Sequence, residues 1–342
     1  SGGTPKTSVE NYWDGDIKWI TPAEINDDTY IINDSVRKIT ELGVQKTGLS
    51  SFPEGTIILS SRAPIGKVAI AGCEMYCNQG FKNLICSDKI YNKYLYWFLK
   101  GNTDFLNSLG RGATFKEISK SIVSEIEINV PDIEHQKDAV NTLEKASEVI
   151  SLRKQELATL DDLIKARFVE MFGDPIRNTQ NRPTTEFINV VRMQRGFDLP
   201  VQDRQQDGEI PVYGSNGALD YHNVAKIQGG GVITGRSGTI GKVFYTEGDY
   251  WPLNTSLFSV DTHGNNVIYL AYLLQLFNLT RFVEGTGVPT LNRNMFHNKQ
   301  IIDVSIDEQK VFADFVHQVD KSKLLVQKSL NETQVLFNSL MQ

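Results

Sequence analysis

The sequence predicts an α+β protein with two mixed α/β domains and two long amphipathic helices, one after each domain. Apolar residues return every seven positions from Glu134 to Met171 and again from Phe312 to the C-terminus, which is typical of helices with a narrow packing stripe. The segment before the first helix is also echoed by the segment before the second, about 175 residues later. A two-copy repeat of this period indicates a duplicated domain rather than a solenoid.

Length and composition fit this organisation. A chain of 342 residues with 40% apolar residues is long enough for two domains with sizeable cores. No apolar run approaches a membrane span and no signal peptide is present, so we expect a cytoplasmic protein. Cys73, Cys77 and Cys86 are odd in number and have no histidine at zinc-site spacing, so we interpret them as reduced thiols and expect no metal site.

The net charge of −6 argues against a freestanding nucleic-acid binder. The charge is uneven, however. Residues 57–121 contain nine Lys or Arg against four Asp or Glu, and residues 222–300 contain six against four. Each block therefore has a mildly basic region, which either contacts an anionic partner or is simply a solvated face.

Residues 1–131 form the first predicted domain. Strands are indicated around residues 15–20, 55–59 and 67–70, and Pro/Gly turns join them. The aromatic-rich segment 91–99 predicts a short helix whose rings are better explained as core than as a base-stacking platform. Residues 122–130 alternate in polarity and predict an edge strand.

Residues 132–174 form the predicted central helix, in which the stretch from Glu134 to Met171 is a rod of roughly 55 Å at about 1.5 Å per residue, and Gly173-Asp-Pro175 ends it. Residues 175–304 repeat the first domain, with strands near 209–213, 231–234 and 242–245 and a helix at 267–277. Residues 305–342 form the second long helix, which the capping box of Ser305 and Glu308 begins.

A helix with so narrow an apolar stripe must pack against another helix. We expect the two long helices to pack against each other. The predicted spacer coiled coil uses Leu143, Ile150, Leu157, Leu160, Ile164, Phe312, Val319, Val326, Leu330 and Phe337. Two helices alone would leave half-buried flanks such as Val149, Leu163 and Phe168 uncovered. We therefore expect the helices to dock partner proteins as well.

No catalytic constellation is visible in the sequence. Residues 235–242 resemble a phosphate loop but fail its pattern, because Arg236 stands at the first glycine position and Val243 replaces the Mg²⁺-binding hydroxyl. The five histidines are scattered, and no nucleophile elbow or paired carboxylate stands out. We expect a non-catalytic chain that holds no cofactor of its own.

The remaining polar residues suit DNA binding, because Arg, Asn and Gln can read base edges whereas Lys, Ser and Thr hold phosphates. Their glycine-rich turns recur in both blocks, with Arg62 matched to Arg236 and Asn78 to Asn254. The candidate DNA-binding residues are Arg62, Lys67, Asn78, Gln79, Lys82, Arg111, Thr114, Lys116, Arg236, Ser237, Lys242, Asn254, Thr255, Thr290, Asn292, Arg293 and Asn294. The alternative is that the two Ile-Gly-Lys turns are tight hairpins that only hold the fold.

The second block has one segment without a match in the first. Residues 186–191 precede Gly196, whereas nothing comparable precedes Gly2. We therefore expect that the sequence lacks a short natural N-terminal segment.

These motifs resemble the specificity subunits of type I restriction–modification systems. The resemblance rests on residues 1–7, on Tyr12-Trp-Asp-Gly-Asp-Ile-Lys-Trp19, on the Ile-Gly-Lys turns and on Leu160-Asp-Asp-Leu-Ile-Lys-Ala-Arg-Phe168. It covers nearly the whole chain, including the duplicated layout. The acidic total charge and the missing N-terminal segment depart from what the family leads one to expect.

The resemblance implies two target-recognition domains that each read one half of an asymmetric, bipartite DNA site, with two antiparallel helices as the spacer. It also implies two methyltransferase subunits that hold S-adenosylmethionine and modify adenine N6, and restriction subunits that use ATP and Mg²⁺. Two alternatives remain open at this point. The chain could be the targeting part of a single-chain type II restriction–methylation system, or a protein scaffold that does not bind DNA.

Overall fold

The computed structural model describes residues 2–62, 64–112, 116–205, 207–285 and 289–341. The chain divides into two compact units: residues 1–153 with 329–342 (unit 1), and residues 154–328 (unit 2). Each unit therefore contains one globular block and parts of both long helices. The division into domains at residues 131, 174 and 304 stays a prediction.

Unit 1 contains a four-stranded sheet in the order β2-β5-β4-β7 and a three-stranded sheet in the order β3-β1-β6. Its elements outside the long helices are η1 (Glu10–Tyr12), β1 (Trp13–Ile20), η2 (Pro22–Glu24), β2 (Ile31–Ile32), β3 (Arg37–Ile39), α1 (Glu41–Thr47), β4 (Ile57–Ser60), β5 (Val68–Ala71), β6 (Tyr76–Cys77), β7 (Phe81–Leu84), α2 (Asn92–Gly101), α3 (Thr103–Ser108) and α4 (Lys120–Ser124).

Unit 2 has the matching sheets β13-β12-β15-β9 and β11-β10-β14, and two further strand pairs, β16-β17 and β18-β8. Its elements outside the long helices are β8 (Thr184–Glu186), α6 (Phe187–Val190), β9 (Arg192–Arg195), η3 (Val201–Asp203), β10 (Ile210–Gly214), β11 (Gly217–His222), β12 (Gly231–Gly235), β13 (Val243–Thr246), β14 (Trp251–Pro252), β15 (Ser256–Asp261), α7 (Val267–Phe277), η4 (Leu279–Phe282), β16 (Val283–Glu284), β17 (Thr290–Leu291), η5 (Arg293–Met295) and β18 (Gln300–Ile302).

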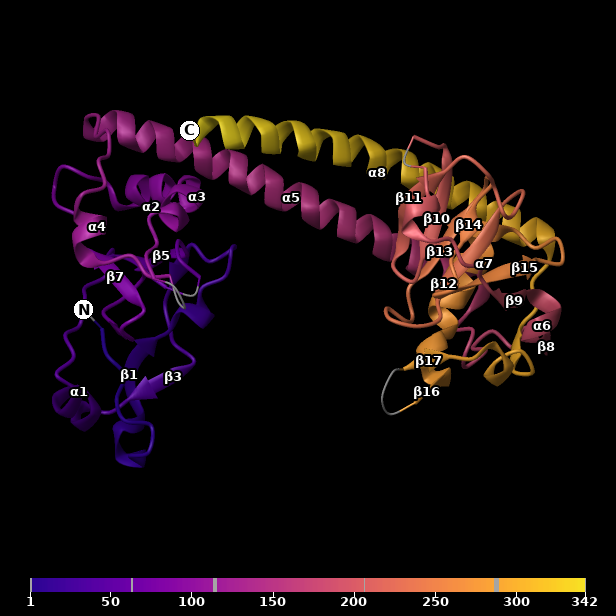
Figure 1. The fold of residues 1–342 in the computed structure, drawn as a ribbon, viewed down its shortest axis with the longest axis horizontal. Helices are drawn as coiled ribbons and strands as arrows, with labels where there is room; N and C mark the ends of the chain where they lie inside the picture. The colour runs from indigo at the N-terminus through magenta and orange to yellow at the C-terminus, as the bar shows by residue number, and fades with distance from the viewer. Residues whose placement is uncertain (1, 63, 113–115, 206, 286–288, 342) are drawn as a thin grey trace. The chain divides into compact units, whose positions relative to one another are not determined.

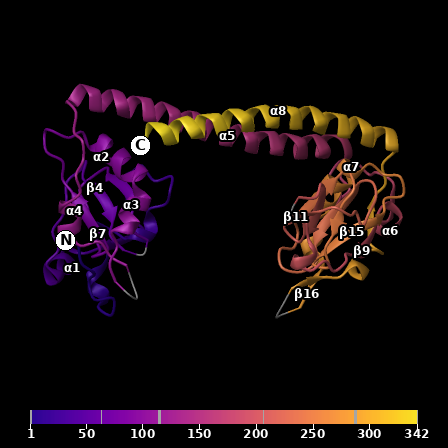
Figure 2. The same cartoon turned by 45° about the horizontal axis from the view of Figure 1, so that its top comes forward.

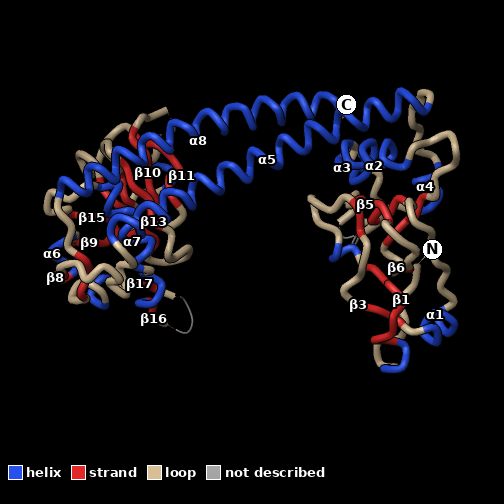
Figure 3. Tube along the Cα trace, turned by 180° about the vertical axis from the view of Figure 1, so that it is seen from behind, coloured by secondary structure: helices blue, strands red, loops and turns tan. Residues whose placement is uncertain are grey.

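Strand registers confirm the duplication. Ile57 pairs with Ile70 in unit 1, and Val232 pairs with Tyr245 in unit 2, so both strands of this hairpin recur 175 residues later. Helix α2 packs on β4 and β5, and α7 packs on β12 and β13 (Figures 2 and 3). Asn266 begins α7 because its side chain accepts hydrogen bonds from the amides of Ile268 and Tyr269. Each unit is therefore a mixed α/β domain with the same central hairpin and helix.

The two long helices are α5 (Ile133–Phe172) and α8 (Ile306–Leu340), both continuous in Figure 1. Gly173, at φ 80°, ends α5, and the Ser305 side chain accepts a hydrogen bond from the Glu308 amide at the start of α8. Eight of the ten predicted seam residues are buried, and Leu157 and Leu160 are half-buried. In unit 2, Phe172 of α5 packs on Phe312 of α8, and Asp161 of α5 forms an ion pair with Lys323 of α8. Residue numbers therefore fall along α5 as they rise along α8, so the two segments run antiparallel there.

A buried glutamine fixes the start of each long helix. In unit 1, Gln136 accepts a hydrogen bond from the Tyr91 amide at the N-cap of α2, and donates to the carbonyls of Lys89 and Pro131. In unit 2, Gln309 accepts from the amide of Asn266 at the N-cap of α7 and donates to Asn265 and to the carbonyl of Val304. Both glutamines are fully buried. The same set of hydrogen bonds therefore links each long helix to the globular block before it.

Two expectations were wrong. Residues 122–130 do not form a strand: Ile122 lies in α4, and residues 125–130 have no regular structure. Phe168 is not on an uncovered flank, because it is fully buried against Phe172, Tyr269 and Phe312 in the core of unit 2. Val149 and Leu163 are exposed as expected. None of the helices described by the structure is long and apolar enough to cross a membrane.

Candidate nucleic-acid interface

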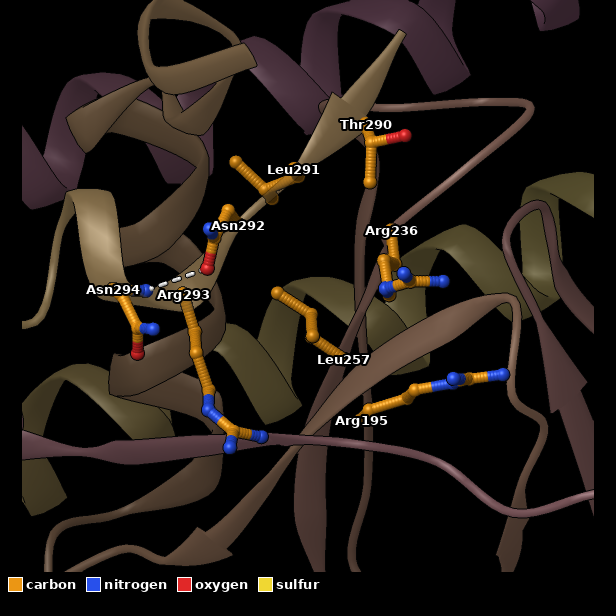
Figure 4. Close-up of a pocket in the computed structure, with 8 residues that line it drawn as sticks. All are labelled: Arg195, Arg236, Leu257, Thr290, Leu291, Asn292, Arg293 and Asn294. Carbon is orange, nitrogen blue, oxygen red and sulfur yellow. Dashed lines mark hydrogen bonds between the residues drawn. The ribbon is translucent and has the colours of Figure 1, made fainter. Parts of the chain in front are cut away.

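Unit 2 carries an open pocket of about 270 Å³ with three arginines around an apolar floor. Figure 4 shows Leu257 between Arg293 on one side and Arg195 and Arg236 on the other. The pocket is lined by Arg195, Arg236, Leu257, Thr290, Leu291, Asn292, Arg293 and Asn294. It thus brings together five of the predicted DNA-binding residues with one arginine that the sequence analysis missed.

Four segments that are distant in sequence build this pocket. Arg195 is the last residue of β9, and Arg236 directly follows β12. In the sheet, β15 lies between these two strands. The amide of Leu291 in β17 donates to the carbonyl of Arg236, which holds the loop after β17 beside the sheet. There the Asn292 side chain accepts a hydrogen bond from the Asn294 amide and caps η5, the short turn that presents Arg293.

The pocket gathers three positively charged side chains. Among the residues that the structure describes, no carboxylate forms an ion pair with Arg195, Arg236 or Arg293, although a guanidinium remains charged at any ordinary pH. A second hollow of about 330 Å³ shares Arg293 and adds Arg192 and His297. Four arginines within two adjoining hollows favour an anion such as a DNA phosphate, or the acceptor edge of a guanine.

His297 stands beside this cluster as a neutral ring. Its Nε2 accepts a hydrogen bond from the Met193 amide at 3.2 Å, which requires that this nitrogen carry no proton. Partial burial lowers the pKa of His297, and the charges of Arg293 and Arg192 lower it further. The imidazole thus holds β9 in place without adding to the positive charge.

Unit 1 differs, because several of its predicted binding side chains are engaged internally. Lys82 forms an ion pair with Glu117 at 3.1 Å and donates to the Ser61 hydroxyl. Lys67 donates to the Pro22 carbonyl, and Gln79 accepts from Thr4. The charge of Lys82 is therefore locally neutralised, in contrast to the arginines of unit 2.

The other predicted residues are spread over both units. Arg111 and Lys116 are exposed, and Thr114 lies outside the described residues. The side chain of Asn78 accepts a hydrogen bond from the Gly80 amide, Lys242 donates to Asn216, and Asn254 donates to Asp198. Ser237 and Thr255 lie beside the pocket through main-chain contacts, since the amides of Arg236 and Ser237 both donate to the Thr255 carbonyl. DNA contact by all seventeen residues stays a prediction.

The pairing of residues between the two blocks needs a correction of one position. The amide of Ser61 donates to the Gly80 carbonyl, and the amide of Arg236 donates to the Thr255 carbonyl, so Arg236 occupies the position of Ser61. Arg62 bridges to Glu117 as Ser237 bridges to Thr290, so Arg62 matches Ser237. Likewise, the Asn78 amide bonds to Ile20 as the Leu253 amide bonds to Tyr213, so Asn78 matches Leu253 rather than Asn254. The two repeated motifs have equal length, and their arginines occupy different positions.

Sequence reasoning missed Arg192, Arg195 and His297. A signal did exist: Arg192-Met-Gln-Arg195 precedes Gly196, and buried Met193 fits a strand with one face in the core. Only the pairing of β9 with β15 places Arg195 opposite Leu257 at the pocket floor.

The comparisons with known proteins match this architecture. A family model described as the type I restriction modification DNA specificity domain matches residues 1–162 and 178–334. The chain belongs to the type I restriction–modification specificity family. Its two matched segments correspond to the two copies that the duplication revealed.

Relatives within this specificity family match different shares of the chain. The MjaIX specificity subunit of Methanocaldococcus jannaschii is 39% identical over 184 residues, which are 52% of this chain and 43% of that subunit. The EcoprrI specificity subunit of Escherichia coli is 22% identical over 349 residues, covering 94% of this chain and 84% of that subunit. The chain thus spans less than half of the archaeal relative and most of the bacterial one.

Solved structures of the specificity family share the fold. The S subunit from M. genitalium has a TM-score of 0.59 at 17% identity, covering 96% of this chain and 92% of that chain. A second similar chain comes from a structure described as the basis of complex assembly and conformational transition of the type I R-M system. Its TM-score is 0.63 at 14% identity, covering 95% of this chain and 90% of that chain. In the part of the chain that the structure describes, no group of three or more His, Cys, Asp or Glu could hold a metal ion.

Proposed function

We propose that this chain is the DNA-reading subunit of a type I restriction–modification complex, and that each unit reads one half of an asymmetric, bipartite double-stranded site. Family membership across both units supports this role. The observation that carries it for this chain is the cationic pocket of unit 2, where Arg195, Arg236 and Arg293 line an apolar floor without a described carboxylate partner.

The two units differ in the chemistry they present. Unit 2 offers guanidinium groups that can bind guanine or phosphate, whereas the Lys82–Glu117 pair of unit 1 combines a donor with an acceptor. A carboxylate can accept a hydrogen bond from cytosine N4, so an ion pair of this kind can take part in base reading. Different side chains at related positions imply different half-sites, and hence an asymmetric target.

The proposed partners carry the chemistry. We infer that two methyltransferase subunits dock on the chain, hold S-adenosylmethionine and methylate adenine N6, and that restriction subunits using ATP and Mg²⁺ join them. The chain itself acts without catalysis, as a subunit that positions its partners on DNA. A cytoplasmic location follows from this role.

Exchange of one reader tests the proposal. Residues 1–131 are replaced by the corresponding block of another family member, and adenine methylation is mapped across the genome of cells that carry the complex. We expect one half of the methylated sequence to change and the other to stay the same. A change in both halves of the methylated sequence would contradict the two-reader function. A hybrid chain that still binds its partners but directs methylation to no site would contradict it as well.

A further inference from the structure

The floor of the arginine pocket in unit 2 has a counterpart in unit 1. In unit 1, Lys82 of β7 pairs with Leu59 of β4. In unit 2, Leu257 of β15 pairs with Thr234 of β12. The two pairs follow the same 175-residue register as the central hairpins, so Lys82 occupies the position of Leu257. The side chain at this position is charged in unit 1 and apolar in unit 2.

A second position of the pocket also has a counterpart. The amide of Ile118 donates to the carbonyl of Ser61. The amide of Leu291 makes the same bond in unit 2, to the arginine that is equivalent to Ser61. Both of these side chains are fully buried, which fixes the two segments in the same way. Glu117 and Thr290, which directly precede Ile118 and Leu291, are therefore equivalent as well.

In unit 1 these equivalent positions form one connected group. The Nζ atom of Lys82 lies 3.1 Å from Oε1 of Glu117 and also donates to the Ser61 hydroxyl at 3.1 Å. The Ser61 hydroxyl is held in turn, because it donates to the Gly80 carbonyl at 3.0 Å and its residue is fully buried. The side chains of Lys82 and Glu117 are 17% and 42% exposed. The ion pair is thus fixed from below and still reaches the surface.

The Lys82–Glu117 pair has hydrogen-bonding capacity left for a ligand. An ammonium carries three donors, and in the described part of the chain Ser61 and Glu117 take two of those of Lys82. A carboxylate accepts several hydrogen bonds, so Glu117 can accept from a ligand while it binds Lys82. The pair therefore offers a donor and an acceptor side by side.

This pattern matches the major-groove edge of a G·C pair. Guanine presents the acceptors N7 and O6, and cytosine presents the donor N4. N4 and O6 are hydrogen-bonded to each other and so lie about 3 Å apart, close to the 3.1 Å between Lys82 Nζ and Glu117 Oε1. In an A·T pair, a lysine that binds adenine N7 would face the N6 donor beside it. A G·C pair thus fits the ion pair better.

Two arginines beside the pair can supply the attraction for the DNA backbone. The amides of Glu117 and Arg111 each donate to the carbonyl of the other at 3.0 Å, and Glu117 also forms a β-bridge with Arg62. Because the Lys82–Glu117 pair carries no net charge, neighbouring cations must attract the phosphates. The pair itself is left to discriminate between bases.

We propose that Lys82 and Glu117 determine the specificity of unit 1, and that together they read one G·C pair in the major groove of its half-site. Lys82 donates to guanine and Glu117 accepts from N4 of the paired cytosine. The inference rests on the proposed DNA-reading function and names the base pair that this site takes. In unit 2 the same positions hold Leu257 and Thr290, so its pocket selects a different base pair.

Replacing both members of the pair tests the proposal in the full chain with the methyltransferase present. Lys82→Leu with Glu117→Thr places the unit 2 side chains in unit 1, and removing both partners of an ion pair together leaves neither charge unpaired. Methylation is measured on a library in which each position of the half-site read by unit 1 is varied, and exchange of residues 1–131 identifies that half-site. We expect the unsubstituted chain to prefer G·C at one position. The double variant should lose that preference at least about fivefold, with the other positions unchanged.

A conservative variant and a matched control sharpen the result. Glu117→Gln keeps the size of the side chain, and because glutamine suits adenine it should move the preference at the same position from G·C towards A·T. Asp34→Thr with Lys38→Leu removes another ion pair of unit 1, at 3.5 Å, and should leave the methylated sequence unchanged.

Three outcomes would overturn the role of the pair in variants that are folded and bound to their partner. They are an unsubstituted half-site without a preferred G·C pair, an unchanged base preference in the double variant, and an equal change in the Asp34 and Lys38 control. These outcomes differ from a failure of the DNA-reading function, which would show as a block exchange that changes neither half of the methylated sequence.

Discussion

At the scale of single residues, the three arginines of the unit 2 pocket differ from Arg167, Arg182 and Arg204, which all form ion pairs within the same unit. Arg204, in the same unit, shows the contrast: it pairs with Asp220 at 3.5 Å and donates to the Leu199 carbonyl. Arg195, Arg236 and Arg293 have no such described partner. Free guanidiniums destabilise a fold by mutual repulsion, and a bound anion relieves that repulsion.

We predict that Arg236→Ala and Arg195→Ala each weaken DNA binding by the assembled complex by about 1–3 kcal/mol, the range for a side chain that reaches a base. Arg62→Ala in unit 1 should also weaken binding. The unfolding temperature should change little for the unit 2 variants, because these side chains have no described internal partner. Mobility-shift titrations at a fixed salt concentration, with the methyltransferase present, measure the effect. Lost stability with unchanged affinity of the folded fraction would instead favour a purely structural hairpin.

His297 should make the stability of unit 2 depend on pH. Its folded pKa lies below the ordinary value of 6.5 through burial, Arg293 and Arg192, so the unfolded chain takes up the proton first as the pH falls. The stabilisation that the neutral His297 gives to unit 2 is complete above about pH 6.5. It is lost as the pH drops through the lower pKa of His297 in the folded state. His297→Gln keeps an acceptor for the Met193 amide but does not titrate. Unfolding temperatures measured across this range should fall less steeply in the variant, and parallel curves would refute the role.

At the scale of elements, the long helices are positioned by the buried glutamines and by aromatic packing rather than by their seam alone. The Gln136 and Gln309 side chains each satisfy one amide and two acceptors in a dry environment. Removing the amide group leaves those partners unsatisfied, which is expensive in a protein interior. In unit 1 the end of α8 also packs edge-on, since Phe337 contacts Trp97 of α2.

We predict that Gln309→Leu lowers the free energy of unfolding by about 1–3 kcal/mol, the cost of leaving a buried polar group unpaired. Gln136→Leu should have a similar effect on unit 1. Gln318→Leu is the matched control, because Gln318 is exposed on α8 and such changes usually stay within about 0.5 kcal/mol. Denaturant titrations of the three variants measure this. A loss at Gln318 as large as at Gln309 would argue against the pinning role.

We propose that partners dock on the exposed apolar residues of the long helices. Leu324 and Leu325 are 71% and 70% exposed on α8. Asp161, by contrast, forms an ion pair with Lys323 at 2.7 Å, so reversing the charge at Asp161 would disturb the pairing of α5 with α8 itself. The test of docking therefore belongs at the leucines.

We expect that Leu324→Asp with Leu325→Asp reduces recovery of the methyltransferase in a pull-down at least tenfold, because desolvating a carboxylate in an apolar interface is costly. The chain should fold normally, since both side chains lie in solvent. Val36→Asp, outside the long helices, should retain the partner. Full recovery with the double variant at moderate salt would exclude this surface.

At the scale of the whole molecule, the two units share one fold but differ in their surface side chains. The 175-residue register and the paired glutamines are shared by both units, whereas their arginines occupy different positions. Duplication followed by divergence of the surface explains how one fold can present two different reading surfaces. The long helices link the two surfaces through a heptad seam.

We predict that this seam acts as a ruler. Seven residues added to both α5 and α8 keep the register and add about 10 Å, equivalent to about three base pairs. The added length also rotates one half-site about the DNA axis by roughly a quarter turn. We therefore expect the preferred number of base pairs between the two half-sites to grow by one to three, with weaker methylation. Four residues added to one helix would break the register. Methylation of a library with varied gaps measures this, and an unchanged gap in a folded, partner-bound variant would refute it.

The sequence by itself determined the duplication, both long helices and six strands, which are β1, β4, β5, β10, β12 and β13. Helix α7 has the predicted bounds, and α2 lies within about two residues of its prediction, because hydrophobic periodicity and turn residues act locally. It also singled out Arg236, Asn292 and Arg293 as candidates for DNA contact, and the structure brings these three residues into one pocket.

Only the tertiary structure decided which of these residues meet. Arg195 joins Arg236 through the pairing of β9 with β15, and Glu117 neutralises Lys82 across 35 residues of sequence. The arginines of the two repeats differ by one position, and the hydrogen bonds of Ser61 to Gly80 and of Arg236 to Thr255 establish that difference. The expected strand at residues 122–130 failed for the same reason: a strand exists only when a neighbour accepts its hydrogen bonds, and that neighbour is chosen by the fold rather than by local sequence.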